Sequence, residues 1–134
     1  MPNIDINIWA VLVATAVNMV VGMVWYSKAL FAKDWSKLTG RKMSEMGDGA
    51  QGYIITTIGA FVQNFILAYI IGWSGANTAA KGSYVALLSW IAFVAVTQGV
   101  NTVFAGTRKK LWAINTGYFL VVLVINGAIL AAWK

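Results

Sequence analysis

Four long stretches without a charged side chain are the feature that most limits what this chain can fold into. They cover residues 8–26, 53–73, 84–105 and 112–133, and all Asp, Glu, Lys and Arg side chains lie outside them. Each stretch has the roughly 20 residues that a helix needs to cross about 30 Å of hydrocarbon. We therefore predict one membrane domain over residues 1–134, with four transmembrane helices.

Composition and periodicity agree with helices in a bilayer. Only 10% of the residues are charged, against about 25% in soluble domains. The stretches show no sustained period-two alternation and exceed the roughly 9 to 11 residues of a barrel strand. The predicted fold class is therefore an all-α polytopic membrane protein. Aromatic residues typical of the membrane interface flank the spans, namely Trp9, Trp25, Tyr26, Tyr53, Trp73, Tyr84, Phe104, Trp112 and Trp133.

The positions of the basic residues predict the orientation. The first and third loops hold Lys28, Lys33, Lys37, Arg41, Lys42, Arg108, Lys109 and Lys110, whereas Lys81 and Lys134 lie on the other side. Cytoplasmic loops are enriched in Lys and Arg, so these two loops should be cytoplasmic and both termini outside. The net charge of +6 then reflects topology and attraction to anionic lipids at the cytoplasmic face, and a nucleic-acid partner is not expected.

The first loop is predicted to contain a short amphipathic helix in the interface. Its apolar side chains, Phe31, Trp35 and Leu38, alternate with lysines that can reach the headgroups. Gly40 is placed to stop this helix, and Ser44 can begin a further turn. We favour the interpretation that this amphipathic segment is a connector between spans over the alternative that it is a motif that docks a partner. The third loop, 106–111, is short enough to force an antiparallel hairpin between the last two spans.

The residue types leave little room for catalysis. The chain has no His and no Cys, so it lacks an imidazole base, a thiolate and a soft metal ligand. No GxxxxGK[ST] phosphate loop is present, and the four acidic residues lie outside the spans. We predict a protein that is not an enzyme, with no catalytic residue, metal site or cofactor.

Amide side chains are the main polar groups inside the spans. They are Asn18, Gln63, Asn64, Gln98, Asn101, Asn115 and Asn126. The predicted polar cluster comprises Asn18, Gln98, Asn101, Asn115 and Tyr118, with Gln63 and Asn64 near the midplane and Asn126 slightly beyond it. These side chains either form hydrogen bonds between helices, which is favoured, or line a wet path for a solute. In particular, we expect Asn101 and Asn115 to meet across the final hairpin.

Several short motifs resemble a family of small bacterial membrane proteins that is catalogued only as a domain of unknown function. The similar residues are Trp25-Tyr26-Ser27, Leu30-Phe31, Lys33-x-Trp35, Asn101-x-x-Phe104-x-Gly106, Ile114-Asn115-x-Gly117-Tyr118 and Gly127-Ala128-Ile129-Leu130 with Trp133. The resemblance implies a four-helix protein of the bacterial inner membrane and supplies no activity or substrate. It also draws attention to Asn101, Asn115 and Tyr118.

Two functions remain open from the sequence. The first is a small integral membrane protein that acts through helix–helix association, as a homo-oligomer or as an accessory subunit of a larger membrane complex. The alternative is a channel or carrier for a small uncharged solute through an amide-lined path. The first is favoured because the interior of a lone four-helix unit is largely filled by its own packing.

Overall fold

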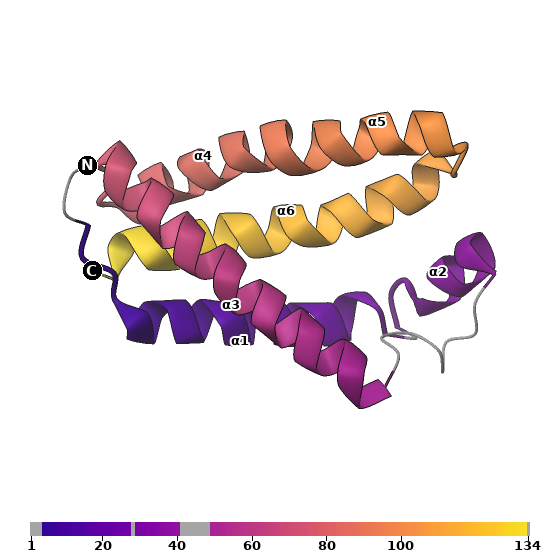
Figure 1. Cartoon of the computed structure of the whole chain (residues 1–134), viewed down its shortest axis with the longest axis horizontal. Coiled ribbons are helices and arrows are strands. Elements are labelled where there is room, and N and C mark those ends of the chain that lie inside the picture. Colours follow the sequence, from indigo (N-terminus) through magenta and orange to yellow (C-terminus); the bar gives the residue numbers. More distant parts are fainter. Residues whose placement is uncertain (1–3, 28, 41–48, 134) are drawn as a thin grey trace.

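The computed structural model describes residues 4–27, 29–40 and 49–133, without the side chains of residues 49 and 50. It is all-α (Figure 1). The helices are α1 (Ile8–Trp25), α2 (Ala32–Thr39), α3 (Gly49–Ser74), α4 (Ala79–Trp90), the π-helical turn η2 (Ile91–Ala95), α5 (Val96–Ala105) and α6 (Lys109–Ala132). Because α4, η2 and α5 run on without a break, four helices are long and apolar enough to cross a membrane, which confirms the predicted fold class.

Helix α6 is the central element of the bundle. It contacts α1, α3, α4 and α5, and Figure 1 shows it between α1 and the α4–α5 span, with α3 crossing the bundle diagonally. Of the apolar window of α6, 44% is buried inside the protein, against 6% for the third span, Ala79–Ala105. The buried core therefore forms around α6, and the third span lies largely at the surface.

A glycine contact brings α4 against α6. A Cβ atom on Gly82 would collide with the backbone carbonyl of Gly127, and one on Gly127 would collide with that of Gly82. Nearby, the Ser83 hydroxyl donates to the carbonyl oxygen of Val124 at 3.0 Å. Small residues allow the close backbone approach that membrane helices use in place of a hydrophobic driving force.

The second, third and fourth spanning helices begin a few residues before the apolar windows. The third span begins at Ala79 rather than at residue 84, because Thr78 caps it by accepting a hydrogen bond from the backbone N–H of Lys81 at 3.2 Å. The turn between α5 and α6 is closed by Gly106, whose φ is +70°, a conformation that glycine adopts without strain. The predicted antiparallel hairpin is confirmed.

The first loop contains the predicted short helix. Helix α2 ends at Thr39 and is capped by Gly40, which has φ +73°, so Gly40 stops the helix as the sequence indicated. It contacts α6, and the Lys110 Nζ lies 3.5 Å from the Asp34 Oδ1 in an ion pair at the surface. Phe31, Trp35 and Leu38 are each partly buried. The turn expected at Ser44 lies outside the described residues, and the location of α2 in the membrane interface stays a prediction.

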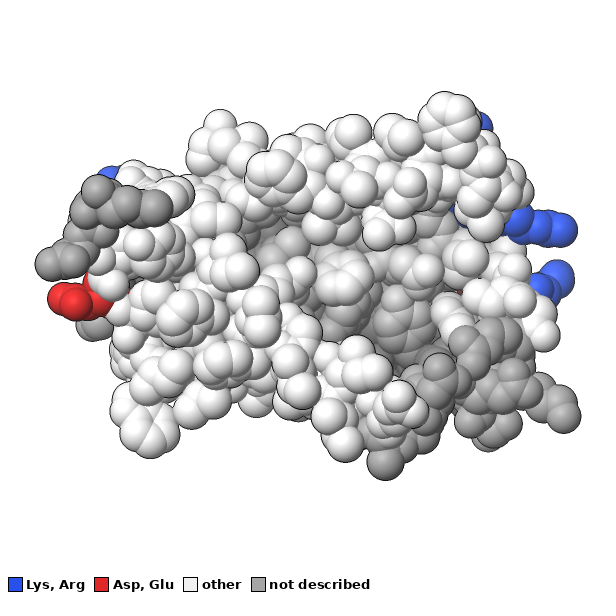
Figure 2. Space-filling model, in the orientation of Figure 1, with Lys and Arg blue, Asp and Glu red and all other residues white. Residues whose placement is uncertain are grey.

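Charged side chains gather at the two ends of the molecule. Figure 2 shows most of the blue basic groups at one end, an acidic group with a smaller blue patch at the other, and an almost uncharged surface between them. Helix α2 and the α5–α6 turn lie at the same end, while both termini lie at the opposite end (Figure 1). The described residues are therefore arranged as a membrane-spanning bundle requires, with charges outside the hydrocarbon.

Candidate functional site

Three asparagine side chains meet in the interior of the bundle. Asn126 on α6 donates through its Nδ2 to the Oδ1 of Asn18 on α1 at 2.6 Å, and to the Oδ1 of Asn64 on α3 at 2.9 Å. The Asn64 Nδ2 also donates to the Asn18 Oδ1, at 3.1 Å. The three residues are at most 2% exposed. This amide cluster, Asn18, Asn64 and Asn126, joins three of the four spans.

The orientation of the Asn126 amide follows from its neighbours. Its Nδ2 faces two oxygen acceptors, so the reversed orientation would bring three oxygens together. The Asn126 Oδ1 is buried without a hydrogen-bond partner in the structure. Leaving a buried acceptor unpaired costs about 1–3 kcal/mol. The cluster therefore combines three interhelical hydrogen bonds with one unsatisfied carbonyl oxygen.

Tyr118 extends the amide cluster along α6. Its hydroxyl donates to the backbone carbonyl oxygen of Asn18 at 2.7 Å. Its ring lies against Gly22, where an added Cβ would be 3.4 Å from the ring. The absence of a side chain at Gly22 thus leaves room for the tyrosine beside α1. Asn18 is held through both its side chain and its main chain.

A second polar pair lies next to Tyr118. The Tyr26 hydroxyl donates to the Asn115 Oδ1 at 2.8 Å, and the rings of Tyr26 and Tyr118 have centroids 5.8 Å apart. Because Tyr26 follows α1 directly and Asn115 lies near the start of α6, this pair ties together the ends of those two helices. Polar side chains thus continue from this end of the bundle to the amide cluster.

Indole N–H groups tie further helices to α6. Trp25 donates to the carbonyl oxygen of Ile114 at 2.9 Å, and Trp90 to that of Thr116 at 2.8 Å. Trp112 of α6 donates in the other direction, to the carbonyl oxygen of Ala95 in η2 at 3.1 Å. Helix carbonyls can accept a second hydrogen bond through their remaining lone pair. These three tryptophans therefore add interhelical bonds, and for Trp25 and Trp112 these bonds come in addition to the interfacial role expected from the sequence.

The predicted polar cluster is only partly assembled. Asn18 and Tyr118 belong to it, and Asn115 adjoins it through Tyr26. Gln98 and Asn101 are instead exposed on α5. The expectation that Asn101 meets Asn115 is wrong, because the Asn101 side chain is exposed and Asn115 accepts its hydrogen bond from Tyr26 on α1's C-terminal side. The difference arises because the pattern of amides gives their depth along each helix but not the face that each helix turns inward.

Asn64 and Asn126 complete the cluster but were not among the predicted site residues. The sequence predicted Gln63 and Asn64 near the midplane and Asn126 slightly beyond it. The choice between the adjacent residues Gln63 and Asn64 depends on the crossing of α3 over the bundle, which places Asn64 inside and leaves Gln63 partly exposed. No local sequence signal distinguishes them.

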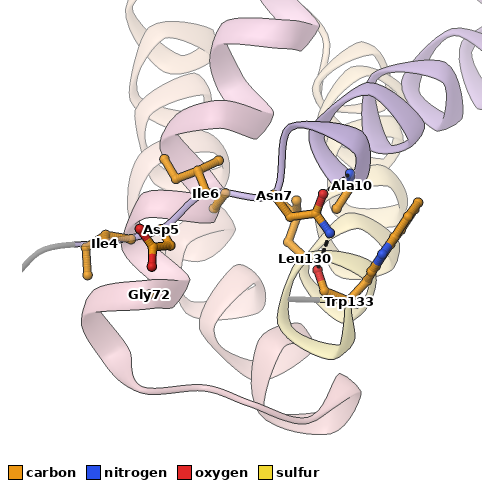
Figure 3. Close-up of a pocket in the computed structure, with 9 residues that line it drawn as sticks. Ile4, Asp5, Ile6, Asn7, Ala10, Gly72, Leu130 and Trp133 are labelled. Atoms are coloured by element: carbon orange, nitrogen blue, oxygen red, sulfur yellow. Dashed lines mark hydrogen bonds between the residues drawn. The ribbon is translucent and has the colours of Figure 1, made fainter.

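An open cavity lies at the end of the bundle that carries both termini. It has a volume of about 530 Å³, and its lining includes Asp5, Asn7, Gly72, Leu130 and Trp133. Figure 3 shows the segment before α1 passing across this end, with the Asn7 Nδ2 donating to the carbonyl oxygen of Trp133 at 3.3 Å. The Asn7 Oδ1 is engaged as the cap of α1. Within the described residues, no group of three acidic side chains is placed to hold a metal ion here or elsewhere.

Comparison with known families identifies the relationship of the chain. A family described as a protein of unknown function, DUF1761, matches residues 9–131. The chain belongs to the DUF1761 family. The match includes all three members of the amide cluster as well as Tyr118. Comparisons with curated proteins and with solved structures give no match. Membership in DUF1761 therefore agrees with the resemblance seen in the sequence and assigns no activity to these residues.

Proposed function

We propose that this protein is a non-enzymatic membrane subunit that works by lateral association, either with copies of itself or within a larger membrane complex. The observation that carries the proposal is the surface of the third span. Only 6% of its apolar window is buried, against 22–44% for the other three spans. Among the described residues α4 buries only Gly82 and Ala86, and α5 buries none. A span so little covered by its own bundle has most of its surface available for another helix.

The interior supports the same proposal. The amides of the cluster are hydrogen-bonded to one another, an arrangement that fixes the helices against one another. Asp5 and Asp34, the acidic residues described, lie outside the spans, so no acid–base pair is available at membrane depth. The polar groups of the interior thus support a structural role for the bundle, with its outer surface as the functional part.

The proposed location is the bacterial inner membrane, with α2 and the α5–α6 turn in the cytoplasm. The support is the number of basic residues at that end, which matches the enrichment of Lys and Arg in cytoplasmic loops. These residues also favour contact with anionic lipid headgroups. The bilayer and its anionic lipids are therefore proposed as the immediate partners of the protein.

The mass of the complex extracted from native membranes in a mild detergent tests the proposed function. One chain has a mass of 14.5 kDa. Native mass spectrometry should give a particle containing at least two chains, or one chain together with another membrane protein. A single chain throughout, at the protein's native abundance and in more than one detergent, would contradict association.

A second candidate is a carrier or channel for a small uncharged solute. The specific observation in its favour is the buried Asn126 Oδ1, an acceptor free to bind a polar group. Solute efflux from proteoliposomes tests this candidate by comparing wild type with Asn126→Leu. If the path exists, flux should fall in the variant while a Gln63→Leu control retains it. Absence of flux in the wild type would remove this candidate.

A further inference from the structure

Two carboxamides lie on the outer surface of the third span. Gln98 and Asn101 are exposed, and the described hydrogen bonds include none from either side chain. Gln98 is seven residues before the end of the span at Ala105, which places it about 10 Å along the helix from that end. Its amide therefore faces the region where lipid tails provide neither donor nor acceptor.

On the exposed first half of α3, the polar side chains are hydrogen-bonded within their own helix. The first half of α3 is also uncovered, and it carries Thr56 and Thr57. Their hydroxyls donate to the carbonyl oxygens of Gly52 at 2.7 Å and Tyr53 at 2.8 Å, both in the same helix. These threonines are therefore satisfied without a partner, as is common for hydroxyls in membrane helices. Unlike these threonine hydroxyls, the carboxamides of α5 have no described partner in their own helix, so their polar groups are left for a group outside the bundle.

The chemistry of this face matches a second copy of the same face. Residues 82–107 contain no charged side chain, so the surface offers nothing to attract a charged partner. A carboxamide provides two N–H donors and a carbonyl acceptor, so a surface that carries Gln98 and Asn101 is complementary to itself. In a twofold interface the same surface patch of the two copies is in contact, so Gln98 and Asn101 of one copy face Gln98 and Asn101 of the other. Thr97 and Ala105, each four residues from Asn101, lie on the same side of α5 as the two amides and are exposed, so they can pack beside them.

The π turn sets the rotation of α5, which carries these amides, separately from that of α4. η2 adds one residue to the helical ladder, with the N–H of Val96 bonded to the carbonyl oxygen of Ile91. An extra residue rotates the following helix by about 100° relative to an unbroken α-helix. After the turn, Gly99 lies beside the Trp112 side chain, which an added Cβ would approach to 3.5 Å. The face of α5 that meets α6 is thus set separately from that of α4.

We propose that two copies of this protein associate in the membrane through the α5 face centred on Gln98 and Asn101, whose side chains form hydrogen bonds across the interface. This inference rests on the proposed lateral association and specifies its partner and surface. Asn101, only four residues from Ala105, is close enough to the headgroups to find water there. Gln98 is the deeper of the two, and it therefore carries more of the specificity of the interface.

Energy transfer between labelled copies in proteoliposomes measures the association. Because the chain has no native Cys, Asn77→Cys in the loop before α4 gives a single labelling site for donor and acceptor dyes. Diluting the protein with lipid then yields a dissociation constant. Replacing both amides, in Gln98→Leu with Asn101→Leu, should weaken association about tenfold or more, since several interhelical hydrogen bonds are lost. Gln63→Leu, which removes a carboxamide from α3, is the matched control and should leave association unchanged.

Disulfide formation locates the contact independently of the stability of the variants. Gln98→Cys and Asn101→Cys should form linked dimers under mild oxidation in the bilayer. Ile58→Cys is the control, because Ile58 is exposed on α3. It lies seven residues after the start of its span at Gln51, as Gln98 lies seven residues before the end of its span at Ala105, so the two positions are at similar depth from the same end of the bundle. It should remain unlinked.

The outcomes separate this inference from the broader proposal. If the wild type associates but the double Leu variant associates equally well, or if residue 58 is linked in place of 98 and 101, the α5 face is wrong while lateral association stands. If copies do not associate but the native particle contains another membrane protein, a second copy is wrong as the partner. A single chain in every measurement overturns both.

Discussion

At the scale of single residues, Asn18 is the most connected polar group of the interior. Its side-chain oxygen accepts hydrogen bonds from Asn64 and Asn126, and its backbone oxygen accepts one from Tyr118. Each of these partners comes from a different position on α3 or α6. A single asparagine on α1 therefore sets how those two helices lie against the first span.

Removing the Asn18 carboxamide should destabilise the bundle. Asn18→Leu leaves the donors of Asn64 and Asn126 without their shared acceptor, and we expect a loss of about 1–3 kcal/mol. Asn126→Leu should also destabilise, but the double variant should lose less than the sum, because both changes remove the same bond. Unfolding in mixed detergent measures the three values, and strictly additive losses would contradict the network.

Asn115 should be coupled to Tyr26 and independent of Asn101. Asn115→Leu and Tyr26→Phe each remove one member of a 2.8 Å hydrogen bond, so their combined effect should fall short of the sum by about 0.6–1.7 kcal/mol. Asn115→Leu with Asn101→Leu should give an additive effect, because Asn101 faces away from the bundle. The same unfolding assay measures both cycles. Coupling to Asn101 in place of Tyr26 would restore the pairing expected from the sequence.

At the scale of helices, close backbone contact fixes α4 against α6, whereas hydrogen-bonding side chains fix α1 and α3. Gly82 and Gly127 allow the first kind of contact, and the amide cluster provides the second. Both kinds are available in lipid, where the hydrophobic effect does not hold helices together. The third span therefore has a strong contact in α4 and a weaker one in α5.

Gly82→Ala should destabilise the contact between α4 and α6. The added Cβ meets backbone atoms of Gly127, which cannot move aside as a flexible side chain would, and overpacking of this kind costs about 1–3 kcal/mol. Gly59→Ala on α3 is the matched control, because its Cβ meets nothing within 4 Å. It should be neutral or slightly stabilising, since alanine is the better helix former. Equal thermal stability of the two variants in detergent would show that the glycine contact is loose.

At the scale of the whole molecule, the structure groups the basic loops at one end of the bundle and the termini at the other. The first-loop helix, α2, contacts α6, and Asp34 pairs with Lys110 near the start of α6. Of the described basic residues, Lys33 and Lys37 of α2 therefore lie at the same end as those of the third loop. This arrangement agrees with a single orientation in the membrane. Which end faces the cytoplasm is decided separately, during insertion, by the cost of moving positively charged loops across the membrane.

Cysteine accessibility tests that direction. Lys81→Cys should react with a membrane-impermeant thiol reagent on intact cells, while Lys37→Cys and Lys109→Cys should react only after the cells are opened. The absence of native Cys makes each label specific. Reaction at 37 and 109 but not at 81 in intact cells would reverse the proposed topology.

The amino-acid sequence by itself determined the number and approximate bounds of the spans, the helix in the first loop with its stop at Gly40, and the final hairpin. These features depend on local properties: uncharged length against bilayer thickness, side-chain spacing, and a glycine free to adopt positive φ. The same reasoning placed the amides by depth. That estimate uses the rise per residue, which is constant along an α-helix.

Only the tertiary structure decided which polar groups meet. The diagonal crossing of α3 places Asn64, and not Gln63, in the hydrogen-bonded cluster. The approach of α1 to α6 allows Asn115 to accept a hydrogen bond from Tyr26, whereas the sequence had paired Asn115 with Asn101. The π turn at Ile91–Ala95 has no clear sequence signal, yet it resets the direction of every later side chain in that span. Rotation of each helix about its axis depends on contacts with all its neighbours, and for that reason it is not contained in the pattern of any one segment.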